Sequence, residues 1–99
     1  MSKIKQILTK QSKLYRKYGL TFVGLFGSGA RGGLSVKSDV DILFDYPMNK
    51  PPSFFQLAKL KNELEKILGR KVDLVSKKAI KPEFYRYIVN DIQKVYDQK

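Results

Sequence analysis

The feature that most constrains the fold is a short apolar run, Val40-Asp41-Ile42-Leu43-Phe44, with one carboxylate inside it and another, Asp39, just before it. Successive side chains of a β-strand point to opposite faces, so a strand here places Asp39 and Asp41 on one face and Val40 and Ile42 on the other. Aspartate is disfavoured within strands, so two of them at this position need a reason. The run therefore predicts a strand with one face in a core and the other in a polar role.

A third carboxylate, Asp73, alternates with Val72 and Leu74 in another predicted strand. It joins the same face as Asp39 and Asp41 if the two strands are neighbours. Three convergent carboxylates can organise two Mg²⁺ ions, whereas Asp-Val-Asp alone is also typical of a solvated turn. The chain has no Cys and no His, which removes thiolate chemistry and the commonest general base and favours hard, oxygen-liganded metals such as Mg²⁺.

A glycine-rich segment, Gly27-Ser28-Gly29-Ala30-Arg31-Gly32, follows directly after a predicted buried strand over 21–26. Its glycines permit a close approach of the backbone, and a helical turn starting there would aim free N–H groups at an anion. Beside a two-metal site, such a cradle implies a nucleoside triphosphate; a plain hairpin loop is the alternative. Arg31 could pair with phosphate oxygens or hold one of the aspartates by a salt bridge, and both roles stay open.

The whole chain, residues 1–99, is predicted to form one domain with helices and strands in the order α-β-β-α-β-α-β. We expect an α/β (α+β) fold, with a small mixed sheet and helices mainly on one face. Apolar spacing and end signals predict three helices, over 4–18 ending at Gly19, over 54–68 between Ser53 and Gly69, and over 82–89. The strands are predicted over 21–26, 40–44 and 72–75, with 92–96 favoured as a fourth over a continued helix.

The charge is strongly positive, with 20 Lys and Arg against 9 Asp and Glu, a net +11. It predicts an anionic partner: nucleic acid, a nucleotide, an acidic protein or a membrane surface. The first 17 residues hold six of the basic residues and no acid, which favours a docking or steering surface. Lys and Gln interrupt the apolar residues there, so the segment is neither a signal peptide nor a membrane span, and we expect a cytoplasmic protein without a membrane contact.

Together, Gly27-Ser28-x-Ala30-Arg31-Gly32 and Ser38-Asp39-x-Asp41 match the signature of the minimal nucleotidyltransferase family of the DNA polymerase beta superfamily, which the chain therefore resembles. The resemblance implies the polymerase-beta palm, also called the nucleotidyltransferase fold. It also implies that Asp39 and Asp41 bind two Mg²⁺ ions, while Asp73 completes the acceptor-side metal and helps to deprotonate the acceptor.

The same resemblance gives roles to the nucleotide side of the site. Gly27 and Ser28 would hold the β- and γ-phosphates, and Arg31 and Ser38 belong to the same nucleotide-binding group. Short members with the Ala-Arg-Gly variant resemble antitoxins whose partner is a helical HEPN-domain ribonuclease toxin. The implied reaction is transfer of AMP from ATP to a tyrosine of that toxin, with release of pyrophosphate.

The sequence is also compatible with two other functions. A catalytically silent antitoxin would neutralise its partner by occlusion, using an apolar sheet face with Val23, Leu25, Leu43 and Val75 next to the aspartates. A nucleotidyltransferase acting on nucleic-acid ends, or a nucleic-acid-binding module, would explain the charge of +11. Against nucleic acid, the basic residues are not confined to one stretch and no RNA-binding aromatic signature is present.

Overall fold

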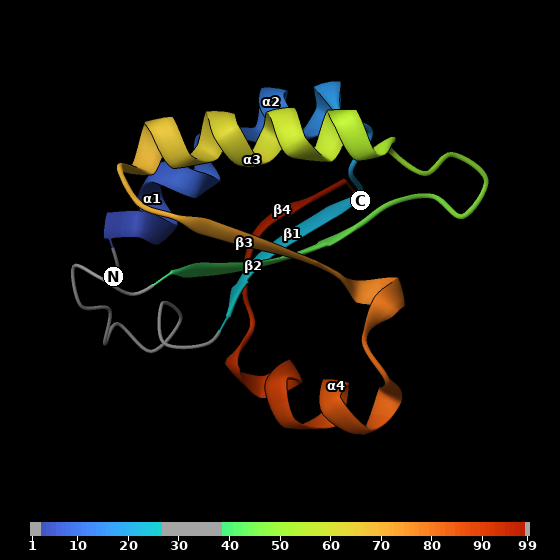
Figure 1. Ribbon diagram of the computed structural model, residues 1–99. Coiled ribbons are helices and arrows are strands. Elements are labelled where there is room, and N and C mark those ends of the chain that lie inside the picture. The colour runs from blue at the N-terminus through green and yellow to red at the C-terminus, as the bar shows by residue number, and fades with distance from the viewer. Residues whose placement is uncertain (1–2, 27–38, 99) are drawn as a thin grey trace.

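A four-stranded mixed sheet organises the protein, as seen in a computed structural model that describes residues 3–26 and 39–98. The strand order is β3-β2-β1-β4 (Figure 1), in which β1 is antiparallel to β2 and β4, and β2 is parallel to β3. The strands are β1 (Phe22–Phe26), β2 (Val40–Asp45), β3 (Val72–Ser76) and β4 (Gln93–Asp97). The predicted mixed sheet is confirmed, including the strand near the C-terminus.

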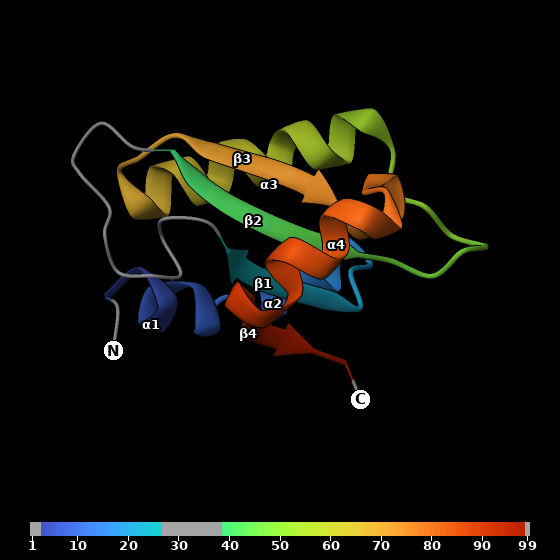
Figure 2. The same cartoon turned by 90° about the horizontal axis from the view of Figure 1, so that it is seen from below.

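Three helices cover one face of the sheet and one lies on the opposite side (Figures 1 and 2). The covering helices are α1 (Lys3–Thr9), α2 (Ser12–Lys17) and α3 (Phe54–Leu68), and the opposite one is α4 (Pro82–Ile88). Short 3-10 turns, η2 (Lys77–Ala79) and η3 (Val89–Asp91), flank α4. The expectation of helices mainly on one face is confirmed, with α4 as the exception. Within the described ranges, no helix is both long and apolar enough to span a membrane.

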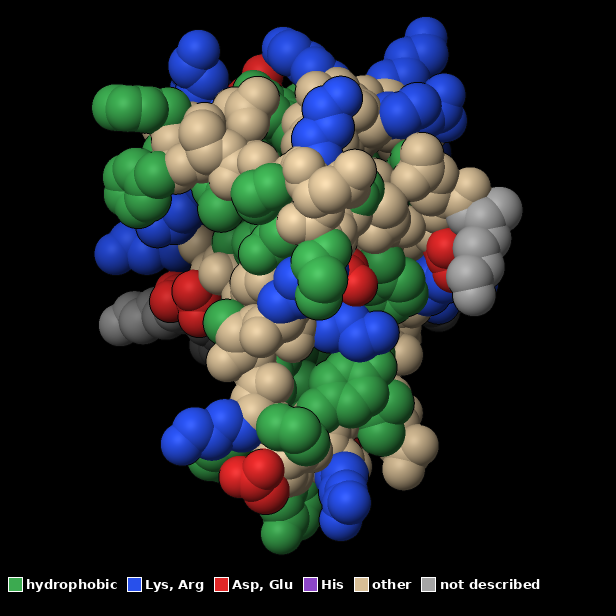
Figure 3. Space-filling view, turned by 90° about the vertical axis from the view of Figure 1, so that its right-hand side faces the viewer, with side chains coloured by type: hydrophobic (Ala, Val, Ile, Leu, Met, Phe, Trp, Pro, Cys, Tyr) green, Lys and Arg blue, Asp and Glu red, His purple; other side chains and the backbone are tan. Residues whose placement is uncertain are grey.

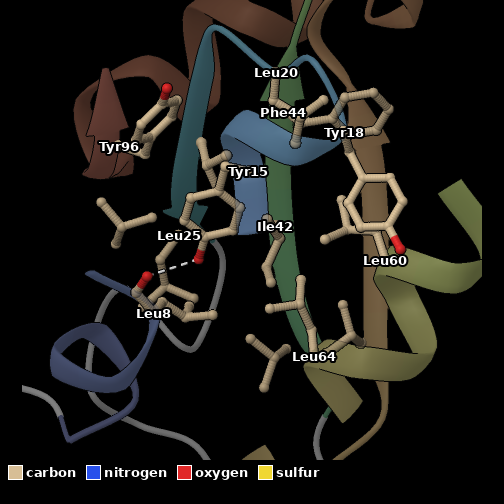
Figure 4. Close-up of a cluster of buried hydrophobic side chains, with 14 residues drawn as sticks. Leu8, Tyr15, Tyr18, Leu20, Leu25, Ile42, Phe44, Leu60, Leu64 and Tyr96 are labelled. Carbon is tan, nitrogen blue, oxygen red and sulfur yellow. Dashed lines mark hydrogen bonds between the residues drawn. The ribbon is translucent and has the colours of Figure 1, made fainter. Parts of the chain in front are cut away.

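The hydrophobic core lies between the sheet and the three covering helices (Figure 4). Leu25 and Ile42 rise from neighbouring strands, where they are paired across the β1–β2 ladder. They meet Leu60 and Leu64 from α3 and Leu8 from α1, and all of these side chains are buried. Burial of each such side chain contributes about 1.5–3 kcal/mol to folding, so this face of the sheet fixes the position of every strand.

The N-terminal helical region departs from the single helix that the sequence predicts. Lys10 and Gln11 separate α1 from α2, and the second helix ends before Gly19, whose positive φ of 75° matches the predicted stop. The break lets Leu8 and Tyr15 both enter the core, where the Tyr15 hydroxyl donates to the Leu8 carbonyl at 2.7 Å. Burial raises the pKa of the Tyr15 phenol well above its ordinary value. A buried hydrogen bond, which periodicity alone does not encode, therefore sets the geometry of this region.

The ends of α3 agree with the prediction and help to position β3. Ser53 and Gln56 form a reciprocal capping box, and Gly69 ends the helix in the left-handed conformation with φ 66°. In the last turn of α3, the Glu65 carboxylate accepts a hydrogen bond of 2.8 Å from the backbone N–H of Val72. This contact ties the first residue of β3 to the helix, so the strand enters the sheet in a fixed register beside β2.

Candidate active site

The predicted carboxylates lie at one end of the sheet. Across the parallel β2–β3 ladder Asp41 is paired with Asp73, and across the antiparallel β1–β2 ladder it is paired with Phe26. This confirms that the two strands are neighbours, and Asp73 therefore shares a face with Asp41. Asp39 is exposed and comes directly before Val40, the first residue of β2. This end of the sheet is therefore formed by the starts of β2 and β3 and by the end of β1.

Electrostatics distinguish Asp41 from its neighbours. Its side chain is partly buried, and this burial raises the pKa of the Asp41 carboxyl above its ordinary value. The negative charges of Asp73 and then Asp39 raise that pKa further. Asp39, Asp41 and Asp73 form no ion pair with any residue that the structure describes. The site is therefore a concentration of negative charge in a protein that is otherwise strongly basic.

The donor set suits a hard divalent cation, because it offers carboxylate oxygens and no nitrogen or sulfur ligand. The raised pKa of Asp41 reflects burial of its carboxylate first and repulsion by Asp73 and Asp39 second, and a bound cation would offset both. Among residues 3–26 and 39–98, however, no three such side chains lie close enough together to form a complete metal cage. The structure thus confirms the shared face of Asp41 and Asp73 but not a preformed site of three ligands.

A hollow of about 550 Å³ opens beside Asp41 and Asp73, between the sheet and the segment that contains α4. Sequence reasoning did not find its walls, which are mainly apolar and include Phe26, Val75, Ile80, Phe84 and Ile88. Phe84 and Ile88 lie four residues apart in α4, the spacing of one helix face, and this pattern was the available signal. An apolar hollow with carboxylates at one side suits a ligand that has a ring at one end and charged groups at the other.

A lysine anchors the segment that leads into this wall. Lys78, in η2, donates to the Asp45 carboxylate and to the Tyr46 carbonyl, and its ammonium lies 4.5 Å from the centroid of the Tyr46 ring. Asp45 also accepts the N–H of Tyr46 at 2.9 Å. Asp45 is therefore engaged at the far end of β2 and is not part of the carboxylate site, although it shares a strand face with Asp41.

The predicted phosphate-binding residues, Gly27, Ser28, Arg31 and Ser38, lie outside the residues that the structure describes. Their roles stay predictions. The described residues on either side of this segment, Phe26 and Asp39, both lie at the carboxylate end of the sheet.

The expected apolar surface beside the aspartates is only partly correct. Val23 and Leu25 are paired with Phe44 and Ile42, so they point into the helix-covered core. Placing them with the aspartates was wrong, because the side a residue faces depends on the β1–β2 register and a single strand does not reveal it. Val75 does border the hollow next to Asp41.

A mixed sheet with paired aspartates at one end is the arrangement of a nucleotidyltransferase, and comparison with known families agrees. The family model described as nucleotidyltransferase domain matches residues 1–95. The chain belongs to this family.

Relatives with similar sequences include two archaeal proteins. The chain is 47% identical over 81 residues to MJ1379 of Methanocaldococcus jannaschii, named as a candidate protein adenylyltransferase, with 81% of each chain covered. It is 36% identical over 93 residues to protein adenylyltransferase MntA of Thermococcus cleftensis, with 93% of this chain and 92% of the relative covered.

Solved structures with the same fold include two antitoxin complexes. A toxin–antitoxin structure with AMP-PNP has a chain that superposes with a TM-score of 0.74 at 24% identity, covering 91% of this chain and 73% of the other. The complex of a tri-AMPylated Shewanella oneidensis HEPN toxin with its MNT antitoxin gives a TM-score of 0.68 at 21% identity, covering 95% and 72%. At these identities the likeness is one of fold.

Proposed function

We propose that this chain is a protein adenylyltransferase that transfers AMP from ATP to a tyrosine of a HEPN-domain toxin, and so acts as an antitoxin. The observation that carries the proposal is the in-register pair Asp41 and Asp73, with Asp39 beside it, at the end of a nucleotidyltransferase sheet. Two further findings support it: the names of the archaeal relatives, and the presence of HEPN toxin and AMP-PNP in complexes of the same fold.

In this proposal Asp39, Asp41 and Asp73 would hold two Mg²⁺ ions, which supply charge neutralisation for a triphosphate and for the leaving pyrophosphate. Gly27, Ser28, Arg31 and Ser38 would bind the phosphates, as the family signature implies. The apolar hollow lined by Phe26, Phe84 and Ile88 would take the nucleoside. We treat residues 1–99 as one catalytic domain that works in the cytoplasm, where ATP is available.

The reaction would be an in-line displacement at phosphorus. The tyrosine oxygen forms a new bond to the α-phosphorus of ATP, and the bond from that phosphorus to the oxygen of the β-phosphate breaks. Pyrophosphate leaves with the bonding electrons. Asp73, on the acceptor side, would help to take the hydroxyl proton. The chain itself contributes positioning and charge, which is why the lack of His and Cys is no obstacle.

A catalytically silent antitoxin that works by occlusion is the second candidate. The observation in its favour is that the described residues do not bring three carboxylates together in a preformed cage. Such a protein would bind the toxin tightly without modifying it.

The test is an AMP-transfer assay with purified protein, ATP labelled on the α-phosphate, Mg²⁺ and a HEPN-domain protein from the same genome. We expect Mg²⁺-dependent label on a tyrosine of the HEPN protein, located by mass spectrometry. Tight binding of that protein without any label would support occlusion instead. Label on added RNA rather than on protein would assign the enzyme to nucleic-acid ends.

A further inference from the structure

Asp73 borders a second hollow in addition to the one that it shares with Asp41. The first is the hollow next to Asp41, on the α4 side of the sheet. The second, of about 460 Å³, lies between β3 and α3, and we call it the β3–α3 groove. Its lining residues besides Asp73 include Phe44, Phe54, Leu57, Lys61, Leu74 and Ser76. A molecule in this groove would therefore lie against β3 on its helix side, whereas the side chain of Asp73 shares the α4 side with Asp41.

Exposed aromatic side chains continue this groove onto the surface. Phe54, which lines the groove, is 82% exposed, and Phe55 beside it is 78% exposed. Their rings meet edge to face with centroids 6.4 Å apart. Figure 3 shows apolar side chains standing out on this side of the molecule with Lys and Arg side chains close by. Neighbouring exposed phenylalanines add little to the core, and such a patch is typical of an interaction site.

The groove also offers unused hydrogen-bonding capacity. The Ser76 hydroxyl oxygen is buried and has no hydrogen-bond partner among the described residues. β3 is the edge strand of the sheet in the described strand order, so the peptide groups on its outer side are not used by the ladder with β2. Edge strands of this kind accept an extended polypeptide as an additional strand. These features favour a polypeptide over a small apolar ligand.

The charges around the groove favour an acidic polypeptide. Lys61 lines the groove, and Lys59 lies two residues before it on α3. The first turn of α3 contains no acid, and the N-terminal end of a helix is the positive end of its dipole. A largely apolar groove with Lys61 in its lining and the positive end of α3 at its mouth is complementary to apolar side chains flanked by Asp or Glu.

We propose that the β3–α3 groove, with Phe54 and Phe55 at its mouth, docks an acidic, partly apolar segment of the protein acceptor. The acceptor hydroxyl then reaches the Asp73 carboxylate around the outer edge of β3, while the nucleotide occupies the hollow on the α4 side. This inference rests on the proposed function and deepens it, because it names the surface that selects a protein acceptor.

The test compares Phe54→Ser and Lys61→Glu with two matched controls. Tyr87→Ser removes an aromatic side chain that is 81% exposed on α4, and Arg86→Glu reverses an exposed charge on the same helix. The probe is a HEPN-domain protein from the same genome, titrated by calorimetry and then used as the acceptor in the AMP-transfer assay. Thermal unfolding followed by circular dichroism verifies that each variant is folded.

We expect Phe54→Ser and Lys61→Glu each to weaken binding of the probe by about tenfold, the effect of losing a central interface contact. The KM for the acceptor should rise in parallel, with MgATP affinity unchanged and both controls like the wild type. Wild-type affinity in both groove variants would overturn the proposal. The proposal would also be overturned if the two groove variants lost affinity for an RNA oligonucleotide but still bound the HEPN protein like the wild type. A wild-type chain that binds the probe but transfers no AMP refutes the proposed activity, while the titrations still decide the docking surface.

Discussion

The two faces of the central sheet differ in how they use neighbouring residues of one strand. Ile42 is 1% exposed and packs among the residues of the helix-covered core. Asp41, the preceding residue, points to the other face, where it meets Asp73 and an open hollow. The buried face is apolar and closely packed, whereas the other carries charges that repel one another. One strand thus provides stability with one set of side chains and a candidate reaction site with the other.

The carboxylate face is therefore maintained at a cost to stability. The charge on Asp41 is costly because the side chain is partly buried and because Asp73 and Asp39 repel it, as its raised pKa reflects, and this cost has to be offset by burial on the helix side. Substitutions on the two faces should therefore separate function from stability. We expect the largest effect on the rate of AMP transfer and the smallest on the free energy of unfolding when the charge of Asp41 is removed.

The largest effect is expected from Asp73→Asn. We predict an AMP-transfer rate lower by about a thousandfold, the size typical of removing a group that stabilises transition-state charge. MgATP affinity should change much less, because the residue serves the acceptor side. Single-turnover kinetics and nucleotide titration measure the two quantities. Glu83→Gln, an exposed carboxylate change on α4, is the control. Equal losses of rate and affinity would instead indicate a structural role for Asp73.

On the opposite face, Ile42→Ala should lower the free energy of unfolding by about 3 kcal/mol, because it leaves a cavity in a packed core. Transfer per folded molecule should be nearly unchanged. Urea denaturation measures the first quantity, with the exposed Lys59→Ala as the control. A loss below about 0.5 kcal/mol, the size typical of a surface position, would contradict the assignment of Ile42 to the core.

A smaller effect is expected from Tyr15→Phe, which removes the donor to the Leu8 carbonyl. The free energy of unfolding, measured by urea denaturation, should fall by about 1 kcal/mol at neutral pH. Because burial raises the pKa of Tyr15, the unfolded chain loses this proton first, and the folded state becomes less stable as the pH rises above about 10. The variant should show a shallower alkaline decline than the wild type. Parallel declines in the two proteins would mean that the phenol is accessible.

The smallest effect tests the cost of the charge on Asp41, which comes from burial of its carboxylate and from repulsion by Asp73 and Asp39. A carboxyl group with a raised pKa binds its proton more tightly in the folded state, so its charged form lowers stability above that pKa and the cost disappears as the pH falls. Without Mg²⁺, Asp41→Asn should therefore be more stable than the wild type at pH 7, by a few tenths of a kcal/mol. The difference should shrink as the pH falls towards about 4. A less stable variant at pH 7 would contradict this cost.

Sequence reasoning predicts those features that neighbouring residues determine. The alternation of Asp41 and Ile42 and the two ends of α3 at Ser53 and Gly69 follow from local pattern and capping chemistry. The shared face of Asp73 was conditional, since it required β3 to lie beside β2, which the ladder confirms.

Features that depend on distant contacts were not predictable in this way. The break between α1 and α2 accompanies a hydrogen bond from Tyr15 to Leu8, and the position of Val23 in the core follows from strand register. The wall formed by Phe84 and Ile88 was missed because a helical pattern does not say which side of the sheet the helix will cover.

The most direct measurement of the central claim is AMP transfer by Asp41→Asn, compared with Ile42→Ala, per folded molecule. The two substitutions affect adjacent residues on opposite faces of β2. We predict that Asp41→Asn remains folded and loses transfer to the HEPN protein by about a thousandfold, while Ile42→Ala is less stable and retains transfer. Transfer at the wild-type rate by folded Asp41→Asn would contradict the assignment of the carboxylate face as the active site.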